Sequence, residues 1–76
     1  MNLPEIQAFG ALATAVKSGR WTALPEDEQR AFWHDAIETC DAVVAAVAGQ
    51  PYDADDALLA NRAELMKQYA ERELDR

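Results

Sequence analysis

The chain has 76 residues, half of them hydrophobic, with 14 Asp and Glu against seven Lys and Arg and a formal net charge of −7. A chain of this length folds as one domain with one modest core, so we expect residues 1–76 to form a single helical domain. The acidity excludes direct binding of nucleic acid through its phosphates and attachment to an anionic membrane, because both need a surplus of Lys and Arg.

The first expected helix covers residues 3–18. Asn2 can cap its start, and Ser18 followed by Gly19 supplies its end. Gly10 lies inside this helix at a cost of about 1 kcal/mol relative to Ala, which a close approach of another backbone would offset. The apolar side chains follow the three-and-four spacing of one buried face: Ile6, Phe9, Leu12, Ala13 and Val16.

The second expected helix covers residues 25–48. Pro25 suits the first helical position, and Gly49 with Pro51 ends the helix. The pattern leaves open whether this helix is continuous or bends near Ala45. Its broad apolar side holds Phe32, Trp33, Ala36, Ile37, Cys40, Val43, Val44 and Val47. The opposite side holds Asp27, Glu28, Asp35, Glu38 and Asp41.

The third expected helix covers residues 53–74, and its acidic start suits the positive end of the helix dipole. Arg62 lies in the middle of the apolar side. Either its stem packs while its head reaches water or a carboxylate, or it pairs across an interface. The apolar side holds Leu58, Leu59, Leu65, Met66, Tyr69 and Ala70.

These three segments predict an all-α fold, a small antiparallel three-helix bundle with a short first helix and two longer helices. At 1.5 Å per residue the helices measure roughly 22, 36 and 33 Å. The first helix therefore reaches only about as far as Glu38 to Cys40. We expect an uncovered apolar end beyond it, unless a bend in the second helix closes that end. The end comprises Val43, Val44, Val47, Tyr52, Leu58 and Leu59.

The sequence contains few side chains that suit catalysis or metal binding. His34 shares the polar side of the second helix with Glu38 and Asp41, but one histidine without further ligands makes a weak metal site. Cys40 lies on the apolar side, away from any base, so it is expected in the core. Trp33 suits either core packing or an interface anchor. We therefore predict that the protein is not an enzyme and binds no cofactor or metal.

The remaining function is binding. We predict a protein–protein interaction module that acts as a small inhibitor, adaptor or regulatory subunit by occupying a partner's surface, which is expected to be basic. Contacts would come from the apolar end and from a polar set: Asp27, Asp35, Glu38, Asp41 and Arg62.

Two alternatives stay open. One is an acidic decoy, of the kind that phages use against restriction or CRISPR machinery, which would block a basic groove by imitating nucleic acid. The other is a structural homo-oligomer, such as a homodimer. The single cysteine, the lack of a signal-peptide pattern and the lack of a long apolar run favour the cytoplasm, or the host cytoplasm if a phage encodes the protein.

Overall fold

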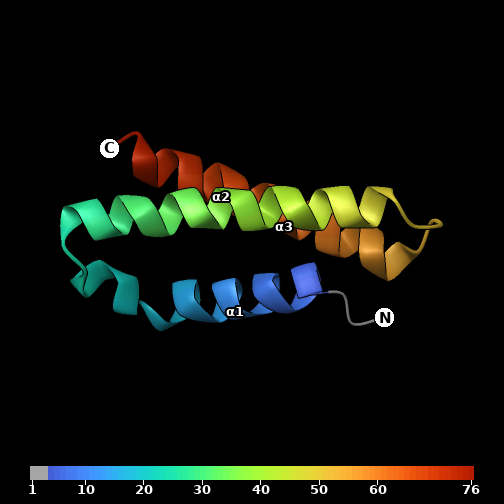
Figure 1. Ribbon diagram of the computed structural model, residues 1–76, viewed down its shortest axis with the longest axis horizontal. Coiled ribbons are helices and arrows are strands. Elements are labelled where there is room, and N and C mark those ends of the chain that lie inside the picture. Colours follow the sequence, from blue (N-terminus) through green and yellow to red (C-terminus); the bar gives the residue numbers. More distant parts are fainter. Residues whose placement is uncertain (1–3) are drawn as a thin grey trace.

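A computed structural model describes residues 4–76, and in that range it contains only helices (Figure 1). Helix α1 covers Pro4–Ser18, the short 3-10 helix η1 covers Arg20–Ala23, α2 covers Glu26–Ala48 and α3 covers Ala54–Leu74. The all-α fold with three helices is as predicted. Successive α-helices run in opposite directions along the long axis of the molecule (Figure 1). The predicted cap at Asn2 lies outside the described residues.

The segment between α1 and α2 is ordered by hydrogen bonds rather than being an open loop. Gly19 ends α1 with a left-handed φ of 74°, a conformation that glycine adopts without steric cost. The Trp21 indole Nε1 donates to the Val16 carbonyl at 3.3 Å. The Gln29 amide Nε2 donates to the Leu24 carbonyl at 2.9 Å. The sequence predicted a stop here but not η1, which these contacts hold against both neighbouring helices.

Two polar contacts join α2 to α3 and show how the two helices lie beside each other. The Arg30 guanidinium donates from Nη1 to the Leu74 carbonyl at 3.1 Å, and the Lys67 ammonium pairs with the Asp41 carboxylate at 2.8 Å. Both join residues far apart in sequence. The start of α2 therefore lies beside the end of α3, and the two helices pack along most of their length.

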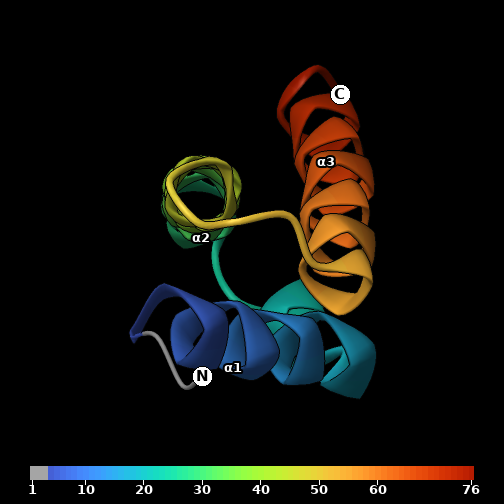
Figure 2. The ribbon, with the colours of Figure 1, turned by 90° about the vertical axis from the view of Figure 1, so that its right-hand side faces the viewer.

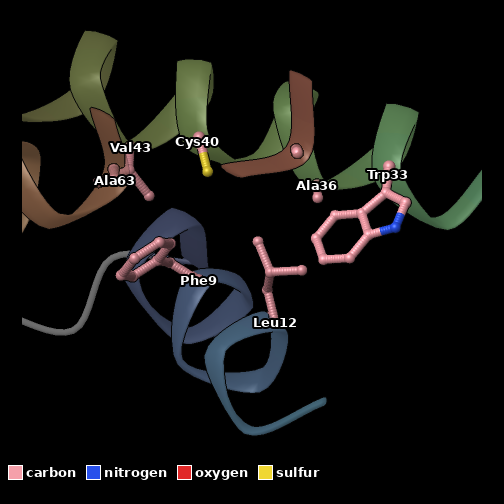
Figure 3. Packing of buried hydrophobic residues seen from close by; sticks show 8 residues of the cluster. Phe9, Leu12, Trp33, Ala36, Cys40, Val43 and Ala63 are labelled. Carbon is pink, nitrogen blue, oxygen red and sulfur yellow. The ribbon is translucent and has the colours of Figure 1, made fainter. Parts of the chain in front are cut away.

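The core consists of a few large side chains set among small ones (Figure 3). Trp33 is 2% exposed and contacts three other rings, with centroid distances of 4.8 Å to Trp21, 4.8 Å to Phe32 and 5.3 Å to Tyr69. Cys40 is a core residue, as predicted, and Trp33 takes the core position that was one of its two predicted roles. The buried set is Phe9, Leu12, Trp33, Ala36, Cys40, Val43, Ala63 and Ala70.

The prediction of an uncovered apolar end is wrong for most of its residues. Val43 is fully buried, and Val44, Val47 and Leu59 are partly buried against the core. Helix α2 is continuous to Ala48, so no bend is needed to close this end. The prediction considered only how far α1 reaches, whereas α3 covers this part of α2. Of the predicted patch, Leu58 and Tyr52 are exposed, at 49% and 88%.

Helices α1 and α3 both pack against α2 but lean in different directions and have few contacts with each other (Figure 2). Gly10 does not mark a close approach of helices, because a Cβ at this position would meet no atom within 4 Å. Within residues 4–76, no helix is long and apolar enough to cross a membrane.

Candidate interaction surfaces

An apolar hollow lies between α1 and the η1–α2 connection. Its volume is about 570 Å³. We call it the aromatic groove, because Trp21 and Phe32 supply its aromatic side chains while α1 supplies small ones. Small residues on one side and rings on the other leave a groove instead of a filled contact. It is lined by Ala11, Thr14, Ala15, Ser18, Arg20, Trp21, Leu24 and Phe32.

The rings of the aromatic groove are held in place by contacts within the chain. Trp21 and Phe32 stack with an interplanar angle of 5° and a centroid distance of 6.4 Å. Both also meet Trp33 edge to face, which is a favourable arrangement of aromatic quadrupoles. The hydrogen bond from Trp21 to the end of α1 fixes the indole further. A ligand that docks here has little side-chain entropy to remove.

The acidic side of α2 adjoins this groove. Glu28 and Asp35 lie four residues before and three residues after Phe32, so they are its neighbours on the helix surface. Asp27, Asp35 and Glu38 are exposed, as predicted for a solvent-facing side.

Asp41 differs from the other predicted acidic contacts, because the chain itself neutralises it. Its carboxylate holds the Lys67 ammonium at 2.8 Å and, through that hydrogen bond, raises the pKa of Lys67. An ion pair within the protein competes with any partner for the same carboxylate. The acidic surface available to a partner is therefore centred on Asp35 and Glu38.

A second hollow, the α1/α3 groove, follows from the divergence of these two helices. Its volume is about 440 Å³. Leu65 is 58% exposed and Tyr69 is 42% exposed along its edge. Arg62 borders this groove, and within residues 4–76 it forms no salt bridge. The lining comprises Phe9, Ala13, Val16, Arg62, Leu65, Met66 and Tyr69.

The sequence identified the apolar residues of α3 correctly but did not separate those that are buried from those that are exposed. Leu59, Met66 and Ala70 contact the core, whereas Leu58, Leu65 and Tyr69 stay exposed. The available signal was Arg62, a charged residue in the middle of the apolar side, which marks the half that faces solvent. The aromatic groove had no comparable signal, because it depends on where η1 places Trp21.

The groups capable of chemistry lie apart. Burial, reinforced by the charges of Asp41 and Glu64, raises the pKa of the Cys40 thiol to about 11, so the thiol is protonated at neutral pH. His34 is exposed on α2. In the described part of the chain, no group of three or more His, Cys, Asp or Glu side chains is placed to hold a metal ion. Comparison of the chain with models of known families, with curated proteins and with solved structures gives no match.

Proposed function

We propose that the protein is a non-enzymatic interaction module, a small inhibitor, adaptor or regulatory subunit, that binds another protein in the aromatic groove and along the adjoining acidic side of α2. The observation that carries this proposal is the fixed aromatic lining. Trp21 and Phe32 are stacked, anchored on Trp33 and still open to a groove of about 570 Å³. Trp is enriched among the residues that dominate binding energy at interfaces.

The chemistry of the groove indicates what the partner presents. An apolar side chain would fill the space between Trp21 and the small residues of α1. A flanking Lys or Arg would meet Glu28 or Asp35, or the face of the Trp21 ring. The partner surface is thus an apolar ridge with basic residues beside it. This proposal keeps the predicted basic partner but moves the apolar contact from the predicted apolar end to the aromatic groove.

A substitution in the floor of the groove tests this proposal. Ala11 lies in the lining and is exposed, so Ala11→Arg adds a long basic side chain to the groove without entering the core. Arg is a good helix former, so α1 should be retained. Ala45→Arg is the matched control, because Ala45 is an exposed residue of α2 outside the groove lining.

The wild type, Ala11→Arg and Ala45→Arg are each immobilised and used as bait to capture proteins from an extract of the organism that encodes the chain. The amount of each captured protein is then compared between the three baits. We expect Ala11→Arg to reduce capture of the partner at least about tenfold, the loss of one interface hot spot. Ala45→Arg should leave capture unchanged. Equal capture by a correctly folded Ala11→Arg chain would reject the groove as the binding site, and so would the failure of the wild-type bait to capture any protein.

The acidic decoy is the second candidate, supported by the exposed carboxylates of Asp27, Asp35 and Glu38. The pairing of Asp41 with Lys67 weakens this candidate, because it removes one charge from the row. The salt dependence of capture distinguishes the interaction module from the acidic decoy. Capture that depends on the aromatic groove should persist at about 0.5 M NaCl, where exposed charges are screened beyond a few ångströms. A decoy should be released there and displaced by DNA or RNA.

A further inference from the structure

One face of α3 carries large apolar side chains that the chain leaves uncovered. Leu58, Arg62, Leu65 and Tyr69 are spaced by four, three and four residues, which places them in one stripe along the helix. Leu58 is 49% exposed, Leu65 58% and Tyr69 42%. With Arg72 one turn further on, we call this stripe the α3 seam. Its spacing is that of a helix that packs against a second helix, yet α1 diverges from it (Figure 2).

The charges of the seam vary along its length. Asp55 precedes the seam in the first turn of α3, Arg62 lies within it, and Arg72 lies in the last turn. Glu64 is two residues from Arg62, about 200° around the helix, so it faces away. The seam therefore has an acidic start, no carboxylate in its centre, and Arg72 at its end, where the neighbouring Glu73 is already paired with Arg76, in a protein whose net charge is −7.

We propose that the α3 seam pairs with the same seam of a second copy, in an antiparallel homodimer whose two-fold axis passes close to Leu65. Pairing around Leu65 brings Asp55 of one copy level with the last turn of the other, within reach of Arg72. It also brings Arg62 level with the ring of Tyr69 in the second copy, where a guanidinium is attracted to the ring face. Each contact occurs twice, as a two-fold interface requires.

The opposite direction of pairing is disfavoured by the same residues. Parallel helices in register would place Arg62 beside Arg62 and Arg72 beside Arg72, and like charges at these positions repel. The second copy's α3 would also cover the open side between α1 and α3, where the α1/α3 groove of about 440 Å³ lies. Three helices and one helix of the second copy would then form a four-helix arrangement around the seam. This dimer is independent of the proposed function, because the seam shares no residue with the aromatic groove.

The first measurement is the mass of the wild-type protein in solution, by sedimentation or by light scattering. The seam is narrow, so its interface belongs to the small class that buries less than about 1,200 Å² and associates weakly. We expect the mean mass to rise from the monomer value of 8.4 kDa toward twice that value between about 1 µM and about 1 mM protein. A constant monomer mass over this range overturns the proposal.

The second measurement uses opposite charges at the position where the two copies meet. Leu65 is more than half exposed, so Leu65→Glu and Leu65→Lys should both leave the fold intact, which circular dichroism checks. Each variant alone should weaken association at least about tenfold, because like charges then face each other across the axis. An equimolar mixture of the two should restore a dimer that contains one chain of each kind.

The matched control is Ala31→Glu, which adds the same charge at an exposed position of α2 that is not part of the seam. It should associate like the wild type. Dimerisation of the Leu65→Glu chain at wild-type strength would show that another surface pairs, and would overturn the proposal. Failure of the mixture to dimerise would overturn it too, because two copies of position 65 would then not face each other.

Discussion

Replacing Gly10 by Ala should stabilise this protein. Gly10 lies inside α1, and a Cβ built there meets no atom within 4 Å, so the added methyl group displaces nothing. Ala is favoured over Gly inside a helix by about 0.8 to 1.0 kcal/mol, in part because it restricts the unfolded chain. We therefore expect the free energy of unfolding to rise by about 0.5 to 1 kcal/mol. A core of this size supplies only about 3 to 5 kcal/mol in total, so the gain is a measurable fraction.

Urea unfolding followed by circular dichroism measures this gain as a higher midpoint at an unchanged slope. A melting temperature raised by several degrees should accompany it, since about 1 kcal/mol corresponds to about 4 to 8 °C in a domain of this size. Gly19→Ala is the contrasting variant, because the left-handed φ of 74° at Gly19 should make Ala cost about 1 to 2 kcal/mol. A Gly10→Ala protein no more stable than the wild type would refute the inference that this side of α1 is open.

Three further results are expected from urea unfolding and circular dichroism. Asp53→Ala should cost about 0.5 to 2 kcal/mol, because the Asp53 carboxylate caps α3 by accepting from the backbone N–H of Asp55 at 2.8 Å and of Asp56 at 3.3 Å. Trp33→Ala should leave the chain largely unfolded, because losing a buried Trp costs about 3 to 5 kcal/mol, as much as the whole core supplies. Burial raises the pKa of the Cys40 thiol from 9.0 to about 11, so the thiol ionises at a lower pH in the unfolded chain than in the folded one. The contribution of the buried thiol to the free energy of unfolding is therefore complete below pH 9 and is lost as the pH rises to 11. Between pH 9 and pH 11, the free energy of unfolding of the wild type should therefore fall by roughly 1 to 3 kcal/mol more than that of Cys40→Ala. Equal decreases in the two proteins would contradict the raised pKa.

The sequence predicted the helices well because their ends are marked locally. Gly19 stops α1, Pro25 precedes α2, and Asp53 caps α3 with its own side chain. These signals depend on neighbouring residues only, so they can be read without knowing the fold. The buried position of Cys40 followed from helical periodicity for the same reason, whereas the sequence left Trp33 between the core and an interface.

The surfaces were predicted less well because they depend on how whole helices are placed. Periodicity indicates which side of α2 is apolar, but not whether α1 or α3 covers a given residue, and Val43 was assigned to the surface on that account. The aromatic groove depends on η1, which brings Trp21 against Phe32 from eleven residues away. No spacing within one helix encodes that contact.

The α3 seam has a physical origin in the small residues of the core. Ala36, Ala63 and Ala70 are fully buried, and small side chains let α2 and α3 approach closely. A close contact built from alanines leaves no room for Leu65 or Tyr69, which lie at its outer edge instead. Half of the chain is hydrophobic, so a core this narrow necessarily leaves apolar side chains outside.

Because the aromatic groove and the α3 seam share no residue, a dimer formed through the seam would present two grooves, and this has a measurable consequence. Two linked grooves bind a surface coated with partner more tightly than one does, through the raised effective concentration of the second site. Leu65→Glu should then weaken binding to the immobilised partner but not to the same partner free in solution. Ala11→Arg should weaken both. If Leu65→Glu weakened binding in solution as strongly as Ala11→Arg does, the seam would itself contact the partner, and the separation of the two surfaces would be wrong.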